Sequence, residues 1–240
     1  MAKTEIEFKI RLKSKKEQDQ IEKTLNSKYD VKIMDHKHLE SDWTFNLNGD
    51  FKFRARFLVY LDDKGQLDFK NCKKIITLKL PRNYDKTVIS HNEIEFEISK
   101  KGFKNDTEFT RIQKILNENG TFKDKISFEN WCFALGNCNE LLDFDKNVNT
   151  FTPRLLAKRH DKIRTTKSFQ FYKSLVEMCL DEFPLGNYFI EFSLSSFTVM
   201  DLFKEKLPEI LEFPEIIVDN RGYGKITNDE KFDLTFQKFL

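Results

Sequence analysis

The sequence has 240 residues, of which 39% are hydrophobic and 14% aromatic, and 25 of them are phenylalanines. That is enough apolar mass for a packed core, so the composition excludes global disorder. The 41 Lys and Arg residues nearly balance the 39 Asp and Glu residues, which argues against a general nucleic-acid or membrane-surface binder.

The N-terminal segment predicts a strand followed by a helix. Residues 4–12 alternate between charged and apolar side chains, as a strand with one apolar face does. The charged side chains of this strand are Glu5, Glu7, Lys9 and Arg11. The polar stretch 14–28 then has apolar residues at helical spacing, and we expect an amphipathic helix with Ser14 as its N-cap and Glu17 at the capping-box position.

Antiparallel strands are predicted through the middle of the chain. The expected strands are 43–47, 51–58, 74–80 and 93–98. The first two flank Asn48-Gly49-Asp50, which has turn chemistry, and a second turn signal follows at 62–65. These segments therefore predict successive hairpins.

Residues 100–150 show no sustained alternation. Ile112, Ile115 and Leu116 predict a helix over about 106–118, and we expect loop with short elements in the remainder. No linker composition separates this stretch from its neighbours. We therefore predict a single domain, 1–240, with a possible helical insertion at about 100–150.

The C-terminal part predicts further strands and one helix. The expected strands are 154–165, 169–180 and 188–195. Pro184-Leu185-Gly186-Asn187 marks a turn, and 199–211 is expected to be helical despite Pro208. The tail from Asp219 is polar and ends in the apolar stretch 232–240.

Cysteine usage and hydropathy indicate the compartment. Cys72, Cys132, Cys138 and Cys179 form no CxxC pair and the histidines do not space with them as zinc ligands, so we expect free thiols in a reducing compartment. No apolar run approaches the roughly 20 residues that span a bilayer. The N-terminus leads directly into a charged strand, so we expect no signal peptide and a cytoplasmic location.

The charged faces of the predicted strands are sorted by sign. The basic positions are Arg54, Arg56 and Lys79, the last of which shares a strand face with Thr77. The acidic positions are Glu93, Glu95, Glu97 and Glu191. An ordinary sheet with one solvated face is the alternative, but such faces normally mix signs. Sorted charge suits an anionic ligand together with a divalent cation. The apolar faces would then point outward and be covered by the predicted helices, and a barrel of about eight strands has room for one small ligand.

The order of these motifs resembles the CYTH, or triphosphate tunnel metalloenzyme, superfamily. The similar motifs are Glu5-x-Glu7-x-Lys9, Arg54-x-Arg56, Thr77-x-Lys79, Glu93-x-Glu95 and a late hairpin over 176–191. The resemblance spans roughly residues 4–225. It implies a mainly β fold, a closed antiparallel eight-stranded β-barrel (tunnel) with helices packed outside, that acts on triphosphates with Mg²⁺ or Mn²⁺.

The resemblance also implies roles for single residues. The implied metal ligands are Glu5, Glu7, Glu93, Glu95, Asp181 and Glu191, of which Glu5, Glu7 and Glu191 are the expected catalytic carboxylates. The implied phosphate-binding residues are Lys9, Arg54, Arg56, Lys79, Lys158, Lys162 and Arg164. A solvated edge strand or a nucleic-acid patch is the alternative for 158–164. Ser193 departs from the pattern, because many relatives carry a second carboxylate at this position after Glu191.

The expected function is hydrolysis of the terminal phosphoanhydride of tripolyphosphate, a nucleoside triphosphate or thiamine triphosphate. The alternatives are a class IV-type adenylyl cyclase, an RNA 5′-triphosphatase, a non-catalytic nucleotide or polyphosphate binder, and a β-sandwich with polar faces. We expect a small-molecule triphosphate partner, no membrane, and no nucleic acid other than an RNA 5′-triphosphate end. The oligomeric state stays open.

Overall fold

The structure is a computed structural model of the 240-residue chain. It describes residues 3–46, 51–80, 83–85, 88–98, 106–118, 126–150, 158–212 and 217–218. Within these ranges, only the backbone is described for residues 3–5, 46, 83–85, 88–91, 126–127 and 217–218. The predicted turn at 48–50 and the tail 219–240 lie outside the described residues.

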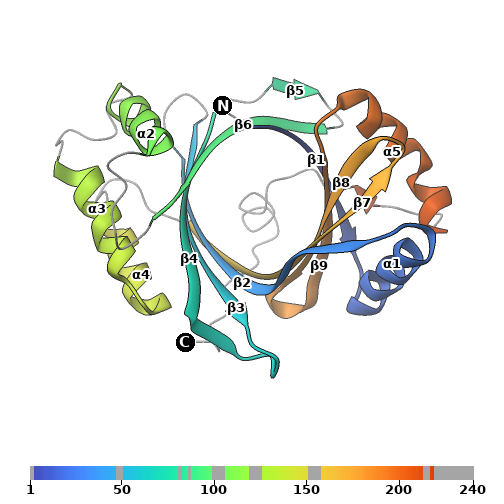
Figure 1. The fold of residues 1–240 in the computed structure, drawn as a ribbon, viewed down its shortest axis with the longest axis horizontal. Coiled ribbons are helices and arrows are strands. Elements are labelled where there is room, and N and C mark those ends of the chain that lie inside the picture. The colour runs from blue at the N-terminus through green and yellow to red at the C-terminus, as the bar shows by residue number, and fades with distance from the viewer. Residues whose placement is uncertain are drawn as a thin grey trace.

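The described strands form one antiparallel sheet. They are β1 (Lys3–Leu12), β2 (Lys32–Asn46), β3 (Lys52–Leu61), β4 (Leu67–Lys79), β5 (Asn83–Asp85), β6 (Val88–Glu97), β7 (Lys158–Phe171), β8 (Ser174–Phe183), β9 (Asn187–Leu194) and β10 (Ile217–Val218). The strand order is β10-β1-β9-β8-β7-β2-β3-β4-β6-β5, and β1 also pairs with β6. Eight strands therefore follow one another as a ring of pairs that runs from β1 through β9 and back to β1 through β6 (Figure 1).

Helices lie outside this ring of strands on two sides (Figure 1). The α-helices of the described residues are α1 (Lys15–Lys28), α2 (Thr107–Glu118), α3 (Ile126–Asn137), α4 (Leu141–Asn149) and α5 (Phe197–Leu211). Helices α2, α3 and α4 lie on one side, and α1 and α5 lie on the other. The predicted mainly antiparallel β fold with helices is thus confirmed, and so are the predicted helices that became α1, α2 and α5.

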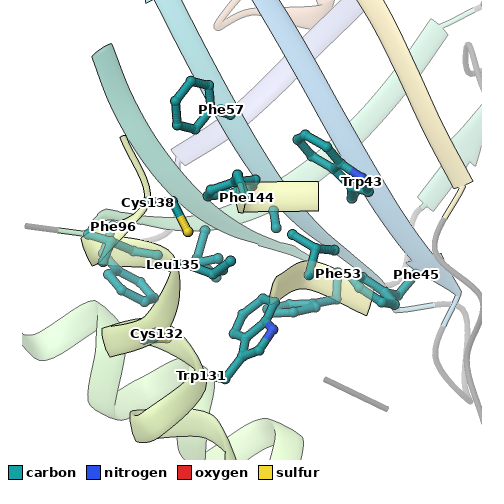
Figure 2. Packing of buried hydrophobic residues seen from close by; sticks show 14 of the residues in the cluster. Trp43, Phe45, Phe53, Phe57, Phe96, Trp131, Cys132, Leu135, Cys138 and Phe144 are labelled. Carbon is teal, nitrogen blue, oxygen red and sulfur yellow. The ribbon is translucent and has the colours of Figure 1, made fainter. Parts of the chain in front are cut away.

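One apolar cluster joins α2, α3 and α4 to the outer face of β2, β3, β4 and β6. Aromatic side chains dominate it, as Figure 2 shows. Trp43 packs against Phe144 of α4 with ring centroids 5.0 Å apart, and Phe57 packs against the same ring at 5.1 Å. Phe53 lies 5.8 Å from Trp131 of α3. The outward side chains of these strands are therefore the apolar ones, as burial by helices requires.

A second apolar cluster joins α1 and α5 to β1, β7, β8 and β9. Phe203 of α5 lies at its centre, with ring centroids 6.1 Å from Phe8, 5.2 Å from Phe192 and 5.0 Å from Phe171. Side chains alternate in direction along a strand, so the residues next to Phe8, Phe171 and Phe192 in their strands point to the opposite face of the sheet. Both clusters thus leave the other face of the ring to polar residues.

Several sequence expectations are wrong in their boundaries, since β4, β6 and β7 begin at Leu67, Val88 and Lys158 rather than at residues 74, 93 and 154. The second strand begins at Lys32 rather than at residue 43, and bulges near Asp35 hide its alternation. The expected strand 169–180 is split by a tight turn at Tyr172, which has a φ of 53° although it is not glycine. The stretch after 118, expected as loop with short elements within a possible helical insertion, contains the helices α3 and α4.

All four cysteines are free thiols, as the sequence predicted. Three of them, Cys132, Cys138 and Cys179, are buried. None of the helices in the described part of the chain is both long enough and apolar enough to cross a membrane.

Candidate functional site

The inner face of the ring, defined as the face turned away from both apolar clusters, carries charge from all eight strands. We call this set the charged belt. Its cations are Lys9, Arg54, Arg56, Lys79, Lys162 and Arg164, and its carboxylates are Glu7, Glu40, Asp42, Glu93, Glu95, Asp181 and Glu191. Each side chain of the belt contacts another one, which lies either on a different strand or two residues away on the same strand. Strands far apart in the sequence are thus connected through one set of ion pairs.

Lys9 joins β1 to β9 within the belt. Its Nζ lies 2.9 Å from Glu7 Oε1 and 2.7 Å from Glu191 Oε2. Burial alone would lower the pKa of Lys9, but Glu191 and Glu7 raise it above its usual range. Burial would likewise raise the pKa of Glu191, and Lys9 and Arg164 hold it well below the usual range. The two carboxylates predicted as metal ligands therefore converge on one ammonium group.

Arg164 forms a fork with Asp181 on the neighbouring strand β8. Arg164 Nε donates to Asp181 Oδ1 and Nη2 donates to Oδ2, both at 2.6 Å. The same Nη2 lies 3.2 Å from Glu191 Oε1. Asp181 is fully buried. The sequence predicted this carboxylate as a metal ligand, but in the structure it forms a bidentate pair with an arginine.

Glu40 and Asp42 of β2 belong to the belt although sequence reasoning did not select them. Asp42 accepts from Arg56 Nε at 2.6 Å and from Arg56 Nη2 at 3.0 Å. Glu40 Oε1 lies 3.0 Å from Arg56 Nη1, and Glu40 Oε2 lies 2.9 Å from Lys162 Nζ. Burial would raise the pKa of both carboxyls, but the cations around them, Arg56 foremost, hold both pKa values well below the usual range.

A histidine contacts each of these two carboxylates. His38 Nε2 lies 3.3 Å from Glu40 Oε1, and His160 Nε2 lies 3.4 Å from Asp42 Oδ2. Leu39, Trp43 and Phe45 keep the spacing of one apolar face, interrupted only by Ser41, and this is the signal that could have identified this part of β2. The prediction missed it because its strand began at residue 43.

Arg54 lies among three carboxylates on β2 and β6. Its Nη atoms are 3.8 Å from Asp42, 3.9 Å from Glu93 and 3.7 Å from Glu95. It donates one hydrogen bond of 3.1 Å to Thr77 Oγ1, and its buried Nε has no hydrogen-bond partner among the described residues. Thr77 in turn donates to Glu95 at 2.9 Å, and Lys79 forms an ion pair with Glu93. The predicted residues of β3, β4 and β6 are thus brought together.

Two predicted site residues, Glu5 and Lys158, are not among the buried side chains of the charged belt that the structure describes. The side chain of Glu5 lies outside the described residues, although its backbone pairs with that of His91 on β6. Lys158 is the first residue of β7 and is exposed, whereas Lys162 and Arg164 on the same strand are buried. The buried part of the basic stretch is therefore the part that belongs to the charged belt.

The donor set of the belt suits a hard divalent cation in its chemistry. Carboxylate oxygens are the ligands that Mg²⁺ and Mn²⁺ prefer. Glu7 and Glu191 are the pair that converges most closely, since both contact Lys9 Nζ. Ser193, on the inner face opposite Glu7 in the β1–β9 register, supplies a hydroxyl and not a further carboxylate. Within the part of the chain that is described, no three His, Cys, Asp or Glu side chains lie close enough together to hold a metal ion.

No protein-family model and no curated protein matches this chain. Solved structures do match. A candidate adenylyl cyclase from Hippeastrum, described as having a dominant triphosphatase activity, is 16% identical with a TM-score of 0.53, over 95% of this chain and 97% of that chain. A protein of Pyrococcus horikoshii is also 16% identical, with a TM-score of 0.49, over 94% of this chain and 99% of that chain.

Likeness at this level of identity concerns the fold, and here it extends over nearly the whole length of both chains. The chain therefore shares the overall fold of this candidate adenylyl cyclase over nearly its whole length, in agreement with the CYTH-type resemblance of its charged motifs.

Proposed function

We propose that this chain is a divalent-metal-dependent hydrolase that cleaves the terminal phosphoanhydride of a triphosphate, inside a closed tunnel formed by the ring of strands. The charged belt is the observation that carries the proposal. It gathers six Lys and Arg side chains and seven carboxylates on one face of the sheet. Such a mixture is stable in a buried place because the charges pair, and it offers cations for phosphoryl oxygens beside oxygens for a metal ion.

The residues of the belt divide the work in this proposal. Arg54, Arg56 and Lys79 on one side, and Lys162 on the other, would neutralise the phosphoryl oxygens of the substrate. Glu7 and Glu191, together with Glu5, would hold Mg²⁺ or Mn²⁺. A metal ion bound there would draw negative charge away from the phosphoryl oxygens. The carboxylates would orient the attacking water and accept a proton from it.

Attack by water fits the one thiol on the inner face. Cys179 lies two residues before Asp181 on β8 and is buried. Burial raises the pKa of the Cys179 thiol, and the nearby Arg164 does not reverse this. A thiol that resists ionisation is a poor nucleophile, so a covalent intermediate on Cys179 is disfavoured.

Formation of cyclic AMP from ATP is the second candidate function. It is favoured by the Hippeastrum protein, which is named as a candidate adenylyl cyclase and yet is described as having a dominant triphosphatase activity. The same belt would hold the triphosphate in either reaction. The products separate the two, because hydrolysis releases orthophosphate whereas cyclisation releases pyrophosphate and a cyclic nucleotide.

A phosphate-release panel tests the proposal. The substrates are tripolyphosphate, ATP, GTP, thiamine triphosphate and an RNA 5′-triphosphate, each with Mg²⁺, with Mn²⁺ and with a chelator. We expect metal-dependent release of orthophosphate from at least one of them. Tight triphosphate binding without any turnover would instead favour a non-catalytic binder, for which Ser193 in place of a carboxylate is the supporting feature.

Substitution of the catalytic carboxylates sharpens the test. Glu7→Gln and Glu5→Gln keep the side-chain shape but remove the charge, and we expect each to lower metal-dependent turnover by at least about 100-fold. Glu22→Gln is the matched control, because Glu22 pairs with Lys167 on the outer side of the ring. Circular dichroism should show the same fold in all variants. Unchanged turnover in both Glu5→Gln and Glu7→Gln would contradict the proposal.

A further inference from the structure

Two buried carboxylates of β2, Glu40 and Asp42, contact most of the cations of the charged belt. Asp42 lies within 4 Å of Arg56, Arg54 and His160. Glu40 lies within 4 Å of Arg56, Lys162 and Arg164. The exposed fraction is 1% for Asp42 and 3% for Glu40, so both carboxylates are shielded from bulk solvent. The pair thus lies where the cations from β3 and β7 meet.

The contacts with Arg56 leave part of its guanidinium available. Nε and one N–H of Nη2 donate to the two oxygens of Asp42, and Nη1 faces Glu40 at 3.0 Å. Each Nη atom of arginine carries two hydrogens, so N–H donors remain for a ligand. A bidentate pair also fixes the plane of the guanidinium, which a single contact would not.

Stability of the fold does not by itself account for these carboxylates. The β2–β3 pairing runs without interruption from His38 to Asn46, so backbone hydrogen bonds already hold the two strands together. Buried ion pairs are often replaceable by apolar residues of similar size without loss of stability, because desolvation offsets their attraction. A role in orienting cations for a ligand explains why charges occupy these positions.

We propose that Glu40 and Asp42 are positioning residues of the triphosphate site, which act by holding Arg56 and Lys162 in the orientation that receives the phosphates. This inference rests on the proposed function, because it assumes that the belt binds a triphosphate. It differs from the roles implied by the family resemblance, which assign no function to β2. The two carboxylates touch the cations rather than the substrate or the metal.

A double-mutant cycle tests the proposal through Arg56. The variants are Asp42→Asn, Arg56→Gln and the two combined, each assayed for KM and kcat with the best triphosphate of the panel. We expect each single variant to lower kcat/KM about 10- to 100-fold, as loss of an orienting partner does. Most of that loss should be a rise in KM, because the phosphate contacts exist before the transition state. The double variant should lose no more than the worse single variant.

Binding without turnover provides the second measurement. Titration calorimetry of tripolyphosphate in the presence of a chelator reports the phosphate contacts alone. Asp42→Asn should weaken this affinity at least about tenfold, and Glu22→Gln should leave it unchanged. If Asp42→Asn fails to fold, Glu40→Gln replaces it: this change keeps the Asp42–Arg56 fork, removes the charge beside Lys162, and should also raise KM about tenfold.

The outcomes separate this inference from the hydrolase proposal. A wild-type protein that releases no phosphate but binds tripolyphosphate, with weaker binding in Asp42→Asn, contradicts the hydrolase and supports the positioning role. An active wild type whose KM and affinity stay within twofold after Asp42→Asn or Glu40→Gln overturns the positioning role alone. Losses that multiply in the double variant also overturn it, because they would show that Asp42 does not act through Arg56.

Discussion

Arg54 and Arg56 stand two residues apart on β3, yet the protein treats their guanidinium groups differently. Asp42 binds Arg56 through two hydrogen bonds, whereas Arg54 has one hydrogen bond, to Thr77, and a buried Nε without a partner among the described residues. A buried donor without a partner is costly, so Arg54 is the less satisfied of the two guanidinium groups. In the proposed triphosphate site, Arg56 is therefore the arginine of this pair that is held more firmly by a carboxylate, and Arg54 is the one held less firmly.

Leu185 offers a stability test at a single position. It connects β8 to β9 with a φ of 62°, is 79% exposed and precedes Gly186, whose φ is 75°. Two successive positive φ values are typical of the hairpin turns that favour Asn-Gly, and the left-handed region costs a leucine roughly 1–2 kcal/mol. We expect Leu185→Asn to raise the free energy of unfolding by about 1 kcal/mol, measured by urea denaturation.

The control for this prediction is Leu175→Asn. Leu175 is likewise an exposed leucine, with an exposed fraction of 50%. It lies in the extended strand β8, where asparagine has no conformational advantage. We expect this substitution to leave stability unchanged or slightly lower. An equal gain in both variants would show that removal of an exposed leucine, and not the turn conformation, is responsible.

Elements with clean periodicity were predictable and interrupted ones were not. Strand β1 and the helix α1 follow from uninterrupted period-2 and helical patterns, and both boundaries agree with the structure to within a residue or two. The first half of β2 was not predicted because register shifts between Ile33 and His38 break its alternation. Its loss mattered for the site, since Glu40 and Asp42 belong to that strand.

The sequence did not predict helix α3, for a different reason. Its buried residues Phe128, Trp131, Cys132 and Leu135 do have helical spacing. Aromatic residues and a nearby Gly136-Asn137 sequence nevertheless favoured a loop, because local propensity for helix is low there. The packing of Trp131 against Phe53 stabilises the helix, and a tertiary contact of this kind cannot be seen in the local sequence.

The N-cap of α1 allows a test at the scale of the element. Ser14 Oγ accepts from the backbone N–H of Glu17, and Glu17 Oε2 accepts from the backbone N–H of Lys13 at 2.7 Å. Because the cap satisfies an otherwise unpaired donor of the first turn, Ser14→Ala should cost about 1 kcal/mol of unfolding free energy. Ser27→Ala, in the last turn of the same helix, should change it by less than about 0.5 kcal/mol. A similar cost in both would rule out capping as the cause.

At the scale of the whole molecule, the sequence indicates which face of each strand is charged but not which charges meet. Sorting of sign along the strands was enough to predict an inward charged surface and to select most of its residues. The partners come from the strand order, which places β2 beside both β3 and β7 and pairs β1 with both β9 and β6. Asp181 shows the difference, since the resemblance implies a metal ligand and the structure places it in a fork with Arg164.

Stability against acid should reflect the whole charged belt. Glu40, Asp42 and Glu191 have pKa values held well below their usual range, with burial opposing and the surrounding Lys and Arg residues causing the decrease. The unfolded chain binds protons at these groups near their ordinary pKa values of about 4. The folded chain does not, so the stabilisation is complete above that range and is lost as the pH falls through the lower, folded values.

We therefore expect the urea midpoint to be nearly constant between about pH 6 and 8 and to fall steeply below about pH 4.5. Lys9 and Arg56, whose pKa values are raised by carboxylates against the effect of burial, add no loss in this window, because they stay charged in both states. Asp42→Asn removes one of the depressed carboxyls, so its midpoint should fall less steeply from pH 5 to pH 3 than that of the wild type. A wild-type midpoint that is constant down to pH 3 would mean that these carboxylates are not ion-paired in solution, and the ring would then lack the buried charged belt on which the proposed triphosphate chemistry depends.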